Sequence, residues 1–141
     1  MSTPSFFIGY AEGASRSTPH LASAAWALYT SGSELFASSG IYLGQATNDI
    51  VEYSAIVKLL TKAISMNIRQ LIVRLDSQLV VRQLEIHYTV RSLTLLRLYM
   101  RVRLLEREFD YVAYQHIPRN LYTYHDTLAN YVLDRHLRNL N

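Results

Sequence analysis

The chain opens with three apolar runs of strand length, at residues 6–13, 22–30 and 35–43. A turn of small residues, Ser31, Gly32 and Ser33, has hairpin length and separates the second run from the third. The first run closes at the acidic residue Glu12. This pattern predicts a meander of three antiparallel strands.

From Thr47 the apolar spacing changes from that of a strand to that of a helix. Thr47, Asn48 and Asp49 are residue types that cap helix N-termini, and the apolar residues behind them recur at helical intervals as far as Asn67. Residues 71–75 then form a short, nearly continuous apolar run, which is typical of a central strand covered on both faces. We therefore expect one long helix followed by a buried strand.

The remaining pattern predicts two helices, a strand and a last helix. Ser77 caps a short helix that ends near residue 87, and Thr94 opens a longer one that ends near residue 108. The strand at 111–117 ends at Pro118, because proline cannot donate a hydrogen bond to a sheet. The final helix covers residues 123–140.

The resulting order, βββαβααβα, belongs to the α/β class. It predicts a single domain over residues 1–141, with a five-stranded mixed sheet and helices on both faces. The first three strands are expected to be antiparallel, and the last two parallel. In such sheets, functional sites gather at the carboxyl ends of the parallel strands, near the point where the strand order reverses.

Composition narrows the possible functions. The 141 residues are 50% hydrophobic and 18% charged, so the chain is expected to fold, and the absence of cysteine excludes disulfides, cysteine-ligated zinc and thiol nucleophiles. The net charge of +3 permits a polyanionic partner without requiring one. No segment approaches the roughly 18 apolar residues of a membrane span, and the first residues lack the basic-then-apolar order of a signal peptide. We expect no membrane partner and an intracellular location, cytoplasmic or nuclear.

Four acidic residues stand at the ends of predicted elements: Glu12, Glu52, Asp76 and Asp126. Carboxylates that share a partly buried pocket need cations to neutralise them, and oxygen ligands select Mg²⁺ or Mn²⁺. The sequence therefore predicts a metal site. The alternative is that each acid only complements a helix N-terminus or ends a strand.

The segments around these acids resemble the motifs of the ribonuclease H family, in its retrotransposon and stand-alone bacterial or archaeal branches. The similar segments are residues 12–16, 47–53, 75–81 and 116–130, in the order in which the family carries them. The resemblance covers about residues 7–135 and implies a ribonuclease H-like fold.

The resemblance also implies an enzyme that hydrolyses the RNA strand of an RNA/DNA hybrid with two Mg²⁺ or Mn²⁺ ions. A reverse transcriptase domain of the same retroelement polyprotein is an expected partner. The implied metal ligands and catalytic residues are Glu12, Glu52, Asp76 and Asp126, with His116 as a further catalytic residue. The implied contacts to nucleic acid are Ser15, Arg16, Asn48, Ser77, Gln78 and Arg119.

One catalytic position departs from the family pattern, because Glu12 stands where the family has aspartate. The extra methylene lengthens the side chain by about 1.5 Å, and a misplacement of about 1 Å can cost a hundredfold in rate. We therefore expect reduced activity with a preference for Mn²⁺, the more tolerant ion. The alternative is a catalytically weakened relative that binds nucleic acid or serves as a structural tether. A nuclease for double-stranded RNA or a strand-transfer enzyme fits the motifs least.

An arginine-rich stretch has two interpretations. It comprises Arg91, Arg97, Arg101, Arg103 and Arg107, with acids among the later members. The arginines either grip the hybrid or form ion pairs along a solvated helix.

Overall fold

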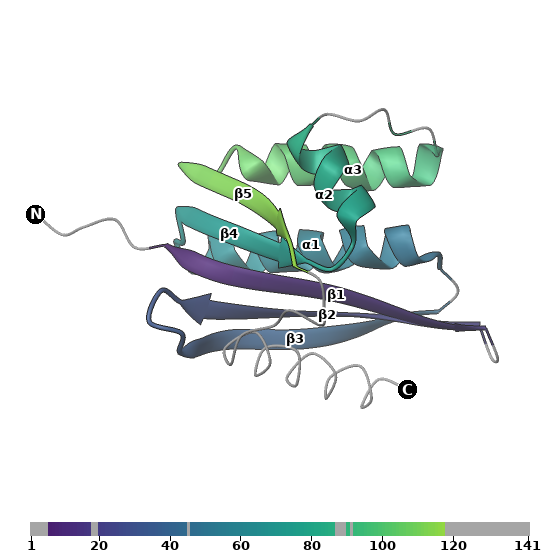
Figure 1. The fold of residues 1–141 in the computed structure, drawn as a ribbon, viewed down its shortest axis with the longest axis horizontal. Coiled ribbons are helices and arrows are strands. Elements are labelled where there is room, and N and C mark those ends of the chain that lie inside the picture. Colours follow the sequence, from purple (N-terminus) through teal and green to yellow (C-terminus); the bar gives the residue numbers. More distant parts are fainter. Residues whose placement is uncertain (1–5, 18–19, 45, 87–89, 91, 118–141) are drawn as a thin grey trace, which may run out of the picture.

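The structure, a computed structural model, describes residues 6–17, 20–44, 46–86, 90 and 92–117 (Figure 1). Its elements are β1 (Phe7–Ser17), β2 (His20–Thr30), β3 (Leu35–Gly44), α1 (Asn48–Ser65), β4 (Gln70–Leu75), α2 (Gln78–Glu85), α3 (Leu93–Glu106) and β5 (Tyr111–His116). This order confirms the predicted one as far as β5. The predicted last helix lies outside the described residues.

The five strands form one sheet in the order β3-β2-β1-β4-β5. β2 pairs antiparallel with β1 and with β3, whereas β4 pairs parallel with β1 and with β5. The hairpin between β2 and β3 turns at Ser33, whose φ of 68° lies in the left-handed region. The predicted mixed sheet is confirmed, and its antiparallel and parallel parts meet between β1 and β4.

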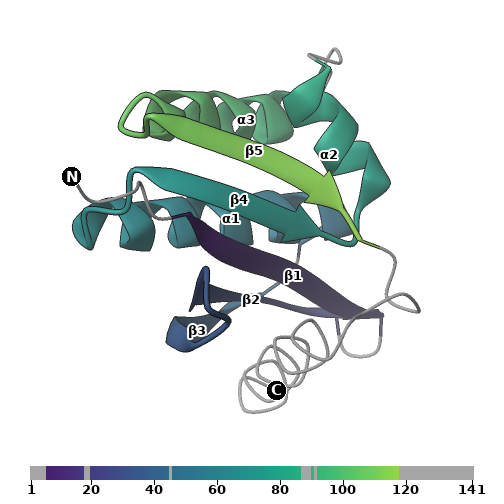
Figure 2. The same ribbon diagram turned by 60° about the vertical axis from the view of Figure 1, so that its left-hand side comes forward.

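The long helix α1 covers one face of the sheet and forms the core with it (Figure 2). Thr47 caps its start by accepting from the backbone N–H of Ile50, and Asn67 follows its end with a φ of 59°. At Gly9 a Cβ would stand 2.8 Å from Leu59 Cδ2, so this glycine lets the helix lie close against β1. α3 packs on α1 from the side of β5.

Two predicted boundaries are wrong. β1 continues beyond Glu12 to Ser17, because it pairs with β2 along its whole length as far as the Ser17–His20 pair. α3 begins at Leu93 rather than at Thr94, because the hydroxyl of Ser92 accepts from the backbone N–H of Leu95 and caps the helix.

The second face of the sheet carries a small cluster of its own. Tyr10 and Tyr29 meet edge to face, with ring centroids 5.7 Å apart, beside the buried Ala25 and Ala27. None of the described helices covers this second face. The expectation of helices on both faces of the sheet therefore stays a prediction. Within the described part of the chain, no helix has the length and apolar character needed to cross a bilayer.

Candidate active site at the carboxyl end of the parallel strands

Glu12 and Asp76 lie at the carboxyl end of the parallel strands, on neighbouring strands. The last registered pair between β1 and β4 is Ala11 with Leu75, and each acid follows its member of that pair. Both acids line one small cleft, together with Tyr10, Ala11, Arg74, Leu75 and Ile117. Glu12 is only 3% exposed. Carboxylates from β1 and from the end of β4, the two strands at the switch point, therefore line the cleft.

Glu52 reaches the same edge from α1, and Gly13 makes the approach possible. A Cβ on Gly13 would clash with the Val51 side chain and stand 3.3 Å from the backbone nitrogen of Glu52. Only glycine lets the first turns of α1 come so close to β1. Glu52 is consequently buried, with an exposed fraction of 5%.

Glu52 and Asp76 form a hydrogen-bonded carboxylate pair. Burial, then the negative charge and hydrogen bond of Asp76, and last the charge of Asp49, together raise the pKa of Glu52 to about 9. Burial also raises the pKa of Asp76, although a backbone hydrogen bond, the bond from Glu52 and the charge of His116 lower it. At neutral pH Glu52 therefore holds a proton and donates it to Asp76.

This pair has the donor chemistry of a site for a hard cation. One oxygen of Glu52, Oε1, is buried without a hydrogen-bond partner among the described residues. A divalent cation in place of the shared proton would offset the burial and the mutual repulsion of the two carboxylates. Glu52 and Asp76 thus fit a metal, and Glu12 lines the adjoining cleft.

The predicted four-carboxylate cluster is only partly within the described chain. The structure joins Glu52 to Asp76 and places Glu12 and Asp76 on one cleft. No three acidic or histidine side chains of the described residues are arranged to hold one ion. Asp126 lies outside these residues, so a set of ligands for two metals stays a prediction.

His116 ends β5 beside Leu75, the residue that precedes Asp76. Its side chain is exposed, and its charge lowers the pKa of Asp76. The imidazole therefore lies within electrostatic range of the carboxylate pair, at the edge where the sequence placed it.

The predicted contacts to nucleic acid surround this edge where the structure describes them. Gln78 and Asn48 are exposed first residues of α2 and α1, and the Ser77 hydroxyl caps α2 by accepting from Val80 N at 3.3 Å. Ser15 and Arg16 belong to β1, but the description does not extend to their side chains. Arg119 lies outside the described residues.

Two residues of the cleft, Tyr10 and Arg74, were missed by the sequence analysis. Arg74 Nη1 donates to the Tyr10 hydroxyl at 2.9 Å, and its Nε donates to Gln115 Oε1 at 3.4 Å. The signal was present in the sequence, because Tyr10 and Arg74 each stand two residues before an acid. The period of two along a strand puts such residues on one face.

Comparison with known proteins agrees with this geometry. Residues 11–132 match a family model described as reverse transcriptase-like. The chain belongs to this family of ribonuclease H-like domains. A bifunctional protein of Mycobacterium tuberculosis is 34% identical over 125 residues, which make up 88% of this chain and 34% of the relative. Ribonuclease HI of Halobacterium salinarum is 35% identical over 125 residues, 89% of this chain and 63% of the relative.

Solved structures of this ribonuclease H-like family share the fold. The crystal structure of RNase H1 from Halobacterium salinarum superposes with a TM-score of 0.82 at 30% identity, covering 95% of this chain and 98% of that one. LC11-RNase H1, solved in complex with an RNA/DNA hybrid, has a TM-score of 0.76 at 26% identity, covering 93% of this chain and 99% of that one. The chain spans only about a third of the mycobacterial relative, 34% of its length.

Proposed function

We propose that this domain is a metal-dependent endonuclease that hydrolyses the RNA strand of RNA/DNA hybrids. The observation that carries the proposal is the pair of the buried Glu52 and the half-buried Asp76 at the carboxyl end of β4, beside the cleft that Glu12 lines. A ribonuclease H-like relative with 26% identity was solved with such a hybrid, which supports this substrate.

Glu52 and Asp76 would hold the metal, with Glu12 from β1 and Asp126 completing the ligand set. Bound Mg²⁺ or Mn²⁺ would supply an activated water and charge stabilisation at the scissile phosphate. The fold positions these ligands. Gly13 lets α1 pack close to β1 at this edge of the sheet, and the β1–β4 register places Glu12 next to Asp76. His116, exposed at the end of β5, would hold or relay a proton near the departing product.

The hybrid would lie across the N-termini of α1 and α2, where Asn48, Ser77 and Gln78 meet solvent. Helix N-termini offer free backbone N–H groups and a positive dipole end to phosphate oxygens. Ser15, Arg16 and Arg119 would extend this contact along the backbone of the nucleic acid.

The second candidate is a relative with weakened catalysis that binds nucleic acid or tethers a neighbouring domain. Glu12 favours it, because a side chain one methylene longer than aspartate is held almost fully buried at a position that should bind metal. Under this alternative the hybrid binds but is cut slowly or not at all.

Cleavage of a labelled RNA/DNA hybrid in Mg²⁺, and separately in Mn²⁺, tests the two candidates. The first requires cutting that Asp76→Asn abolishes and that is faster in Mn²⁺. Hybrid binding without cutting in either ion, by protein shown to be folded, would establish the second.

The wider context is also part of the proposal. The family description names reverse transcriptase, which supports a retroelement polyprotein and a reverse transcriptase domain as neighbour. Measuring whether this domain stimulates or is stimulated by a reverse transcriptase supplied with the same hybrid would test that partnership.

A further inference from the structure

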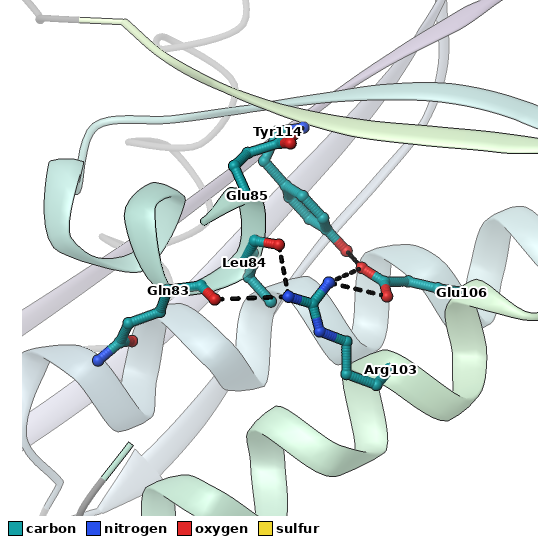
Figure 3. Close-up of polar contacts among 6 residues, drawn as sticks. All are labelled: Gln83, Leu84, Glu85, Arg103, Glu106 and Tyr114. Atoms are coloured by element: carbon teal, nitrogen blue, oxygen red, sulfur yellow. Dashed lines mark hydrogen bonds and ion pairs between the residues drawn. The ribbon is translucent and has the colours of Figure 1, made fainter. Parts of the chain in front are cut away.

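The last turn of α2 is fixed by a side chain from α3 (Figure 3). Arg103 Nη2 donates to the backbone oxygens of Leu84 at 2.5 Å and Gln83 at 3.4 Å. The last carbonyls of a helix have no partners within the helix, and a positive charge is favourable at that end. Arg103 therefore acts as a C-terminal cap supplied by another helix.

Arg103 is itself held in place. Its Nη1 donates to both carboxylate oxygens of Glu106, at 3.0 and 3.1 Å, and its guanidinium lies 4.9 Å from the ring centre of Tyr99. Glu106 also accepts from the Tyr114 hydroxyl at 2.7 Å. Burial, and then the charge of Glu106, raise the pKa of Tyr114 well above its usual value, so this hydroxyl stays a donor. The guanidinium thus has one orientation, aimed at α2.

Two further bonds tie the same turn to the sheet and to α1. Glu85 Oε1 accepts from the backbone N–H of Tyr114 on the edge strand β5 at 2.5 Å. The Tyr53 hydroxyl of α1 donates to Gln83 Oε1 at 2.8 Å, inside the core. The backbones of α2 and α3 make little direct contact, and the Arg103 side chain bridges the two helices with hydrogen bonds.

The attachment matters because α2 is short and begins at the candidate site. Its eight residues extend over only about 12 Å, and helices of this length are marginal without tertiary contacts. Its N-cap, Ser77, directly follows Asp76, and Gln78 is its first residue. A tilt at the far end of α2 therefore displaces the groups at its beginning.

We propose that Arg103 is a positioning residue: by capping α2 it holds Ser77 and Gln78 in the orientation that receives the hybrid. This inference rests on the proposed function. Arg103 does form the ion pair considered for the arginine-rich stretch, with Glu106 of the same helix. The inference adds the capping of α2 and assigns Arg103 no direct contact to nucleic acid.

The test compares Arg103→Met, which keeps the apolar stem and removes the fork, with Arg69→Met. Arg69 pairs with Asp110 on the surface at the opposite end of β4, so it is the matched control. Arg103→Lys retains the charge and carries the test if the methionine variant does not fold. All measurements are made at a temperature where unfolding curves show every variant folded.

Two readouts separate positioning from a general loss of stability. Amide hydrogen exchange at Val80 and Val81, whose N–H groups bond to Ser77, should be about tenfold faster in Arg103→Met than in wild type or Arg69→Met. KM for the hybrid should rise about fivefold with kcat within about twofold. Arg103→Lys should give intermediate values.

Unchanged exchange at Val80 and Val81 together with unchanged KM, even with a lowered melting temperature, would overturn the inference and leave Arg103 a structural residue only. If the wild type neither binds nor cuts the hybrid, the proposed function fails. Exchange at the two valines then still decides whether Arg103 orders the start of α2.

Discussion

Replacing Glu52 with glutamine should stabilise the metal-free protein. Folding raises the pKa of Glu52 from 4.5 to about 9. The protonated Glu52 therefore contributes its full stability to the folded state below pH 4.5, and this contribution is lost as the pH rises towards 9. At 1.36 kcal/mol per pH unit, the loss at pH 7 amounts to about 3 kcal/mol. Glutamine keeps a donor for Asp76 and does not titrate, so Glu52→Gln avoids this loss.

Thermal unfolding in a chelator, followed by circular dichroism from pH 4 to 8, measures the effect. The melting temperatures of wild type and Glu52→Gln should coincide near pH 4 and differ by about 10 °C at pH 7, with the variant higher. Added Mg²⁺ should raise the melting temperature of the wild type, because it favours the ionised pair, and should raise that of the variant less. A variant no more stable than wild type at pH 7 in the chelator would refute the argument that burial and Asp76 hold a proton on Glu52.

Three further outcomes are expected. Glu12→Asp should increase Mg²⁺-dependent cleavage of the hybrid, whereas an equal or lower rate would show that the longer side chain is accommodated. Gly13→Ala should lower the free energy of unfolding by about 1–3 kcal/mol through overpacking, and should abolish stabilisation by Mg²⁺. Chemical denaturation measures both effects. Gly32→Ala is the control, because a Cβ there would meet nothing nearer than 3.8 Å. Tyr114→Phe should lower the free energy of unfolding by about 1–2 kcal/mol, because it removes a buried donor to the Glu106 carboxylate. Tyr111→Phe, at an exposed position, should leave the denaturation midpoint unchanged. Equal midpoints for the two variants would contradict the network of Figure 3.

The sequence predicted the meeting of Glu52 and Asp76 because both are tied to strong local signals. Asp76 ends an apolar run that is typical of a central strand, and Glu52 follows a helix cap at Thr47. The parallel pairing of β1 and β4 then brings the carboxyl ends of their paired segments to the same edge of the sheet. Periodicity and capping placed both acids at element ends, and the resemblance to the ribonuclease H family selected them as site residues.

What the sequence could not supply were contacts that depend on close approach and on long side chains. Nothing local to Gly13 shows that α1 packs against it, because Val51 is distant in sequence and only the folded packing brings the two together. Arg103 was one arginine among several in the sequence. Its distinct role comes from the position of α2 relative to α3, which no period along either helix specifies.

The arrangement of the two faces makes the side-chain length at Glu12 important for the proposed metal site. Gly9 and Gly13 of β1 face α1, so the alternation of the strand turns Glu12 to the second face, with Tyr10 and Arg74. Glu52 approaches Asp76 from the α1 side instead. A metal that joins all three must therefore sit at the end of the sheet, where carboxylates from both faces converge, and the length of the side chain at position 12 sets where it can bind. We therefore expect a change of one methylene at Glu12 to affect catalysis more than the fold.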